Sequence, residues 1–506
     1  MVGHQDRWQE DLFVAGPLRD LIPEEHILKR VDKVLDLSWL REEVKDTYSP
    51  DLGRPSIDPE SAVRLMLAGF FQGIVQDRKL MREAQVNLAI RWFAGYRLHE
   101  KLPDHSNLTR IRQRWGAERF RRIFERTVKA CRKAGLVDGE TVHIDASLIR
   151  ADVSWESLTR EHVEQVLEEN VVEEERSNEE PPKGRPGRPR TRPPQEKRVS
   201  TTDPDATMTT DNKKWRLEPS FKQHTAVDDR AGVIVDVAVT TGEASEGRQL
   251  LEQLARIEVT SGTTVKTVTA DAGYAHSTNY QALEERQTDA VIPPQAHPRN
   301  AKRIPARRFK YDAKHQVARC PGGRTLSRKG RVAHRGGWRY RARACDCSTC
   351  PLRPRCLSKT AKTRTLVILD GYEALLRARR RHARGWDEPT REHYRRHRWR
   401  VEGIHGEAKT QHGLHRAVRR WLANVAIQVY LTAAVMNLKR LAGALAAFFW
   451  PVLLRAIRPT RFPMPLSRFL GAFTPDSRGT HPCYRPAHTT SVNPTSSTAP
   501  RYPYLG

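Results

Sequence analysis

The strongest constraint on the fold is a series of strand-like and helix-like segments that begins near residue 139. TVHIDAS, FKQHTAVDD, GVIVDVAVTTG and TVKTVTAD have the composition of strands, and AVIPP reads as a short final strand. GRQLLEQLARIEV and STNYQALEERQ read as helices between the later strands. The second and third strands are joined at DDRAG and form a hairpin. This order predicts an α/β fold, in which helices pack on a mixed sheet.

Three acidic residues occupy informative places in this framework. Asp145 ends the apolar part of TVHIDAS, Asp271 ends TVKTVTAD, and Glu402 lies on the predicted helix YRRHRWRVEGIHGEAK. Two strand-end carboxylates and one from a helix can hold two divalent cations, Mg²⁺ or Mn²⁺. Two such cations suit phosphodiester chemistry, because one activates the attacking oxygen and the other stabilises the leaving oxygen. We therefore predict that these three residues are catalytic metal ligands.

The helix around Glu402 has a cationic face. At about 100° per residue, Arg398 and Lys409 share a stripe with Glu402, whereas Glu407 falls on the opposite side. This pattern predicts phosphate contacts by Arg398 and Lys409 on either side of a metal ligand. The alternative is an ordinary solvated helix face with an Arg–Glu pair at i,i+4.

The charge of the chain indicates its partner. The formal net charge is +28 and the sequence pI is about 10.2, which favours nucleic acid over the alternative of an anionic membrane surface. Two apolar runs, 421–438 and 441–454, contain polar residues or a proline and are interpreted as buried helices. The start, MVGHQDRWQEDLF, lacks the apolar region of a signal peptide. We expect no membrane association and a cytoplasmic location, beside the nucleic acid that the chain binds.

Residues 1–138 are predicted to be a helical domain that binds DNA. PESAVRLMLAGFFQGI starts with a proline suited to a first helical turn. PDHSNLTRIRQRWG predicts a helix bearing Arg110, Arg112 and Arg114 as DNA contacts. The pattern leaves open whether these helices form a helix-turn-helix or a plain bundle with a basic surface.

The remaining chain is divided by composition. The catalytic core is predicted to begin in 139–295, with an acidic and then Pro/Arg-rich insert at 155–215, and to resume with helices in 385–450. Within the insert, GRPGRPR is either a minor-groove binding segment or a flexible linker. A cysteine-rich insert is predicted at 296–384, and a disordered tail, rich in Pro, Ser and Thr, at 451–506.

Five of the seven cysteines fall in the second insert. Cys347, Cys350 and Cys356 have CxxC-x5-C spacing, and Cys320 can supply a fourth thiolate, with Cys345 as a spare. Four thiolates at this spacing predict one structural Zn²⁺. The alternative is a set of unligated, reduced cysteines.

Four stretches together resemble a known family. They are GRPSIDPESAVRLMLAGFFQGIVQDRKLMREAQVNLAIRWFAGY with PDHSNLTRIRQR; HIDASLIRADVS; STTDPDATMTT with HTAVDD and TADAGYAHSTNY; and VEGIHGEAK. In this order they resemble DDE transposases of bacterial insertion sequences that carry an N-terminal helical transposase domain. The stretches cover most of residues 50–445, and Asp145, Asp271 and Glu402 stand at the three acidic positions of the family.

The resemblance implies a ribonuclease-H-like core, Mg²⁺ dependence, cleavage at the terminal inverted repeats, strand transfer into target DNA, and a homo-oligomer on double-stranded DNA. The family's glutamate helix carries Tyr-x2-Arg-x3-Glu-x6-Lys. Arg398, Glu402 and Lys409 match it, whereas three residues separate Tyr394 from Arg398. His405 stands where relatives often have Phe. Two alternatives stay open: an inactive DNA-binding protein of the same fold, or a nuclease without strand transfer.

Overall fold

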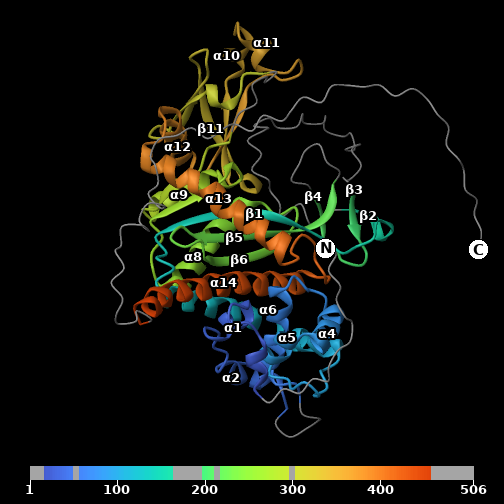
Figure 1. Cartoon of the computed structure of the whole chain (residues 1–506). Helices are drawn as coiled ribbons and strands as arrows, with labels where there is room; N and C mark the ends of the chain where they lie inside the picture. Colours follow the sequence, from blue (N-terminus) through green and yellow to red (C-terminus); the bar gives the residue numbers. More distant parts are fainter. Residues whose placement is uncertain (1–15, 50–55, 163–195, 210–216, 296–302, 457–506) are drawn as a thin grey trace, which may run out of the picture. The chain divides into compact units, whose positions relative to one another are not determined.

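A six-stranded mixed sheet lies at the centre of the described chain (Figure 1). Its strand order is β4-β5-β1-β7-β8, and β6 also pairs with β5. β5 is antiparallel to β1, β4 and β6, whereas β7 is parallel to both β1 and β8. The strands are β1 (Thr141–Arg150), β4 (Thr207–Thr209), β5 (Glu218–Asp228), β6 (Ile234–Thr241), β7 (Thr267–Ala270) and β8 (Asp289–Val291). The predicted hairpin and mixed α/β architecture are confirmed.

The computed structural model describes residues 16–49, 56–162, 196–209, 217–295 and 303–456. The Pro/Arg-rich segment GRPGRPR and most of the predicted tail lie outside the described residues. One compact unit spans residues 1–449, and a second comprises 450–506.

The register of the sheet decides which side chains share a face. Ile144 of β1 pairs with Ala270 of β7, and Asp145 pairs with Thr225 of β5. The prediction that Asp145 ends its strand is wrong, because β1 continues to Arg150 along β5. Since side chains alternate between faces, Asp145 and His143 share one face of β1.

Helices cover both faces of this sheet. α13 (Glu388–Gln411) contacts β1, β5, β7 and β8, and crosses the sheet in Figure 1. α8 (Glu246–Ser261) packs on β6, β5 and β1, and its Gln253 donates to the carbonyl of His224 in β5. α9 (Ser277–Glu285) packs against α8, β8 and α12 (Tyr372–Arg384). The predicted helices after β6 and β7 are therefore present.

The N-terminal region is helical, as predicted. It contains α1 (Ile27–Asp32), α2 (Leu40–Val44), α3 (Pro59–Phe71), α4 (Asp77–Val86), α5 (Leu88–Phe93) and α6 (His105–Lys133). α3 begins with Pro59, and Asp58 caps it by accepting from the Ser61 N–H. Asp104 caps α6 by accepting from the Ser106 N–H, and α6 is interrupted at Gly116 by a φ of 69°.

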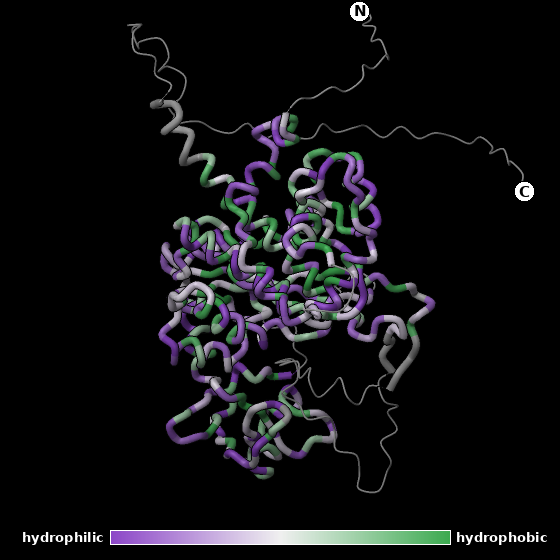
Figure 2. The backbone as a smooth tube through the Cα atoms, turned by 90° about the horizontal axis from the view of Figure 1, so that it is seen from below, coloured by the Kyte–Doolittle hydropathy of each residue, from purple (hydrophilic) through white to green (hydrophobic). Residues whose placement is uncertain are grey.

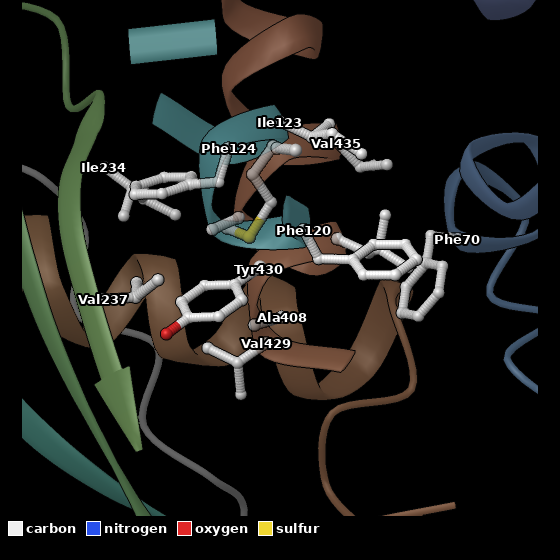
Figure 3. Close-up of a cluster of buried hydrophobic side chains, with 14 of the residues drawn as sticks. Phe70, Phe120, Ile123, Phe124, Ile234, Val237, Ala408, Val429, Tyr430 and Val435 are labelled. Carbon is white, nitrogen blue, oxygen red and sulfur yellow. The ribbon is translucent and has the colours of Figure 1, made fainter. Parts of the chain in front are cut away.

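One hydrophobic core joins the N-terminal helices to the sheet. Figure 3 shows Phe70 of α3, Phe124 of α6, Ile234 of β6, Ala408 of α13 and Tyr430 gathered in this core. Tyr430 belongs to α14 (Leu422–Ala456), which extends into the segment predicted to be disordered. Figure 2 shows hydrophobic and hydrophilic stretches interspersed along the described chain. Within the described chain, no helix is long and apolar enough to span a membrane.

The second insert contains a separate antiparallel sheet. Its order is β13-β12-β11-β10-β9, and it encloses a small core of its own. The elements are β9 (Lys310–Asp312), β10 (Val317–Arg319), β11 (Thr325–Val332), β12 (Gly337–Ala342), α10 (Ala344–Ser348), α11 (Arg353–Cys356) and β13 (Thr365–Leu369).

The first insert contains a two-stranded ribbon. β2 (Leu158–His162) pairs with β3 (Glu196–Ser200) as an antiparallel ribbon. The acidic composition of SWESLTREHVEQVLEENVVEEERSNEE predicts a surface helix. This prediction is wrong for β2, because the ladder with β3 supplies its backbone partners.

Candidate active site

Two aspartates lie side by side on neighbouring parallel strands. Because Ile144 pairs with Ala270, Asp145 and Asp271 are the next residues along β1 and β7. β7 ends at Ala270, and the Asp271 carboxylate caps the short turn after it by accepting from the Gly273 N–H at 2.8 Å. The sheet therefore fixes the backbone of both aspartates at the same level.

The environment of Asp145 disfavours its negative charge. Burial, and then the carboxylates of Asp271, Glu246 and Glu402, raise the pKa of Asp145 to about 7. The pKa of Asp271 is also raised, by burial and by Glu246, whereas Lys222 opposes this effect. Four carboxylates from β1, the β7 end, α8 and α13 therefore act on one another.

Glu402 reaches this cluster from α13. Its side chain is 63% exposed, and Arg398 Nε lies 3.2 Å from Glu402 Oε1. Glu407 lies elsewhere on the helix: it pairs with Lys439 and Arg440 of α14. Glu402, and not Glu407, is thus the acid of α13 that acts electrostatically on Asp145.

Glu246 is a member of the cluster that sequence reasoning missed. It is the first residue of α8, and its Oε1 lies 3.1 Å from Lys222 Nζ. A Cβ atom placed on Gly273 would meet Glu246 Oε2 at 2.6 Å and Asp271 Oδ1 at 3.0 Å. Both oxygens therefore lie close to Gly273. An acid at the first turn after the hairpin was the available signal in the sequence.

Two family comparisons identify the chain. Residues 16–114 match the transposase domain family DUF772, and residues 319–442 match the transposase DDE domain family. The chain is a DDE transposase. Glu402 lies within the second matched segment, whereas Asp145 and Asp271 lie between the two.

Other comparisons add little to this identification. No curated protein matches the transposase. Among solved structures, it is similar to the piggyBac transposase synaptic complex with hairpin DNA, at 9% identity and a TM-score of 0.27. That match covers 86% of this chain and 82% of the other. A likeness at this TM-score carries no argument about fold or function.

A buried polar chain fixes α13 to the sheet of the transposase. Thr269 Oγ1 lies 2.6 Å from His143 Nδ1 and 3.0 Å from His397 Nδ1. His143 Nε2 is 3.0 Å from Asp229 Oδ1, and the His397 ring stacks on Tyr394 with centroids 5.8 Å apart. Burial lowers the pKa of His397 to about 4, so this imidazole is neutral. These linked side chains hold α13, the helix that carries Glu402, in a defined position over β1 and β7.

Tyr394 and His405 lie beside the carboxylates. Burial, and then the charges of Asp271 and Asp145, raise the pKa of Tyr394. His405 Nδ1 lies 3.8 Å from Asp145 Oδ2, and burial lowers the pKa of His405 to about 3. Its buried Nε2 has no hydrogen-bond partner in the described part of the chain. Neutral His405 therefore borders Asp145 without forming a charged pair.

The carboxylates have the chemistry of ligands for a divalent cation, but their side chains are not positioned around one common point. Oxygen ligands suit Mg²⁺ and Mn²⁺, and mutual repulsion of acids is relieved by a cation. Within the described ranges, no three His, Cys, Asp or Glu side chains stand arranged to hold a metal. Glu402 is directed to Arg398, so a metal site here requires Glu402 to leave that arginine.

The three arginines of α6 have different environments. Arg110 and Arg114 are exposed, and Arg114 lies over the Tyr48 ring at 4.7 Å. Arg112 is 3% exposed, and its guanidinium donates to both Asp77 oxygens at 2.7 and 2.8 Å. The prediction of a DNA contact is therefore wrong for Arg112, which holds α6 to α4. For Arg110 and Arg114 it stays a prediction.

The cationic face of α13 also remains a prediction. Arg398 is 80% exposed and pairs with Glu402. Lys409 is half-buried, and its charge lowers the pKa of His405, after the larger effect of burial. Both cations therefore lie beside the carboxylate cluster, as phosphate contacts would require.

The zinc prediction is not supported. Cys320, Cys347, Cys350 and Cys356 are all free thiols. Burial raises the pKa of Cys356, and the other three cysteines contribute to the same shift, so the four lie in one region. The described residues include no metal-holding arrangement of cysteines. Instead, Cys347 is buried in the small core of the insert, with Cys320 and Cys356 packed against it.

Proposed function

We propose that this transposase cleaves DNA at the ends of its insertion sequence and joins the freed 3′ ends to target DNA. Asp145, Asp271 and Glu402 are the proposed metal ligands. The observation that carries the proposal is the pairing of Ile144 with Ala270, which sets the two aspartates side by side under the glutamate helix. The large positive charge of the chain suits a DNA substrate.

A ribonuclease-H-like core is part of this proposal. An antiparallel β6-β5-β1 unit followed by parallel β7 and β8, with helices on both faces, supports it. In this arrangement the carboxylates emerge where β1 and β7 lie next to each other. Helix α13 adds its acid from above the same strands.

Bound Mg²⁺ or Mn²⁺ would activate the attacking oxygen and stabilise the leaving oxygen. The protein side chains prepare the site for it. Asp145, with a pKa of about 7, must lose its proton to become a ligand. Glu402 must leave Arg398, and the released guanidinium is then available to a phosphate oxygen. The Thr269-linked histidines hold α13 in place during both steps.

The proposed partners are DNA duplexes. Arg398 and Lys409 would contact phosphates beside the scissile bond, and Arg110 and Arg114 would contact a duplex along α6. The proposed DNA is the terminal inverted repeats and the target, bound by a homo-oligomer in a bacterial cytoplasm. The phosphate contacts rest on charge, exposure and position, whereas the terminal repeats, the oligomer and the location rest on the family resemblance.

A strand-transfer assay tests the proposal. The protein is incubated with Mg²⁺, a labelled duplex from the DNA that flanks its reading frame, and a plasmid. Nicked and joined products are expected from the wild type, and Glu402→Gln should abolish both. Glu388→Gln is the matched control, since Glu388 is an exposed acid of the same helix that pairs with Arg391. Nicking without joining would favour a nuclease, and binding without nicking would favour an inactive DNA-binding protein.

A further inference from the structure

An ion pair lies next to the proposed metal ligands. Lys222 Nζ is 3.1 Å from Glu246 Oε1 and donates to the Ala244 carbonyl at 3.0 Å. Both side chains are largely removed from solvent, at 13% and 26% exposure. Lys222 projects from β5 and Glu246 begins α8, so the pair joins the sheet to the helix on the side opposite α13.

The second oxygen of Glu246 is turned toward Asp271. From the position that a Cβ on Gly273 would take, Glu246 Oε2 is 2.6 Å away and Asp271 Oδ1 is 3.0 Å away. The two oxygens are therefore at most about 5.6 Å apart, the sum of those distances. Bonds from a cation to oxygen are about 2.0–2.6 Å long, so one cation can bridge two carboxylate oxygens up to about 5.2 Å apart. A shared cation therefore requires this pair to lie only slightly closer than its upper bound.

A buried hydroxyl in the same place lacks a partner. Tyr274 is fully buried, and its Oη has no hydrogen-bond partner among the residues that the structure describes. Glu246, Asp145 and Asp271 all act electrostatically on this hydroxyl. A buried hydroxyl without a partner is costly, and a hydrated cation among these three acids would supply one.

We propose that Glu246 is a fourth carboxylate ligand of the divalent cations, and that Lys222 neutralises it until a cation binds. The inference rests on the proposed function, because it extends the same site. Lys222 occupies the position of a competing cation, and its removal from Glu246 accompanies metal binding. A purely structural ion pair, which fixes the start of α8, is the alternative.

Binding of Mn²⁺ to the full-length, DNA-free protein distinguishes the two roles. Free Mn²⁺ is measured by electron paramagnetic resonance at pH 8, and folding is checked by circular dichroism. The variants are Glu246→Gln, Lys222→Met, the double variant, Asp145→Asn, and Glu252→Gln as the control. Glu252 is 67% exposed on the same helix and also pairs with a cation.

We expect Glu246→Gln to weaken Mn²⁺ binding by at least about tenfold. Lys222→Met should tighten binding several-fold, on the order of threefold or more, because the competing charge is removed. That gain should vanish in the double variant, since Lys222 competes only through Glu246. Glu252→Gln should bind as the wild type does.

Two further results separate this inference from the proposed function. If Asp145→Asn loses Mn²⁺ binding while Glu246→Gln stays within about twofold of the wild type, the fourth ligand is rejected and the metal site stands. If neither change alters Mn²⁺ uptake, the proposed metal site itself is wrong. If Glu246→Gln fails to fold, Lys222→Met decides: tighter binding supports the inference, and unchanged or weaker binding overturns it.

Discussion

Removal of the Asp145 charge should stabilise the metal-free protein, but only above about pH 4, where the carboxyl group of the unfolded chain is ionised. In the folded state the pKa of Asp145 is raised from 3.8 to about 7, chiefly by burial and then by neighbouring acids. A raised pKa contributes stability that is fully present below the unfolded value of 3.8. That contribution is lost as the pH rises through about 7. Asp145→Asn should therefore gain stability relative to the wild type between about pH 4 and pH 8.

The size of the effect follows from the pKa shift. A shift of about three pKa units corresponds to about 4 kcal/mol, at about 1.4 kcal/mol per unit. The Asp145 side chain is 25% exposed, so water and salt screen part of this. We expect about 2 kcal/mol, which is about 2–3 °C in melting temperature for a chain of this size.

Differential scanning fluorimetry in EDTA measures this effect. The difference in melting temperature, Asp145→Asn minus wild type, should be near zero at pH 4.5 and positive at pH 8. Added Mg²⁺ should raise the melting temperature of the wild type, because the cation neutralises the acids. It should leave the melting temperature of Asp145→Asn unchanged. A difference that is flat from pH 4.5 to pH 8, or a wild type that is more stable at pH 8 without metal, would refute the reasoning.

Four further predictions test other parts of the structure. Against the effect of burial, hydrogen bonds with His412 and Lys439 and the charge of Arg440 lower the pKa of Glu407 to about 2, and its stabilisation is lost as the pH falls through that value. Glu407→Gln should therefore lower the melting temperature above about pH 4.5; a pH series checks the sign. Arg112→Ala should destabilise the fold by on the order of 3 kcal/mol in urea denaturation, since Asp77 loses a buried partner. Arg110→Ala should leave stability unchanged and flatten the salt dependence of DNA binding. Gly273→Ala should abolish Mg²⁺-dependent cleavage but not DNA binding, because its Cβ would collide with carboxylate oxygens; equal loss of both would contradict this.

Local sequence pattern sufficed for the elements that carry the acids. Alternation of apolar residues predicted β1, β5, β6 and β7, and the hairpin turn predicted the antiparallel pairing of β5 with β6. The place of Asp271 directly after β7 also followed from its run. The length of β1 did not, because the strand beyond Asp145 is stabilised by pairing with the distant start of β5.

Residues that depend on tertiary packing were missed. The packing of α8 against the sheet brings Glu246 close to Asp271. No local sequence pattern predicts this tertiary contact. Arg112 was assigned to a basic surface from composition alone. Its spacing from the buried Leu108 and Trp115, four residues before and three after, places it on the inner face of α6. In a chain that is basic overall, composition alone does not distinguish a buried, paired arginine such as Arg112 from an exposed one.

The location of Mn²⁺ in crystals of the protein, determined by anomalous scattering, tests the central claim most directly. The account predicts Mn²⁺ bound by oxygens of Asp145, Asp271 and Glu402, at about 2.0–2.3 Å, with Glu402 released from Arg398. Mn²⁺ bound away from these residues, or bound to the aspartates while Glu402 remains paired with Arg398, would contradict it.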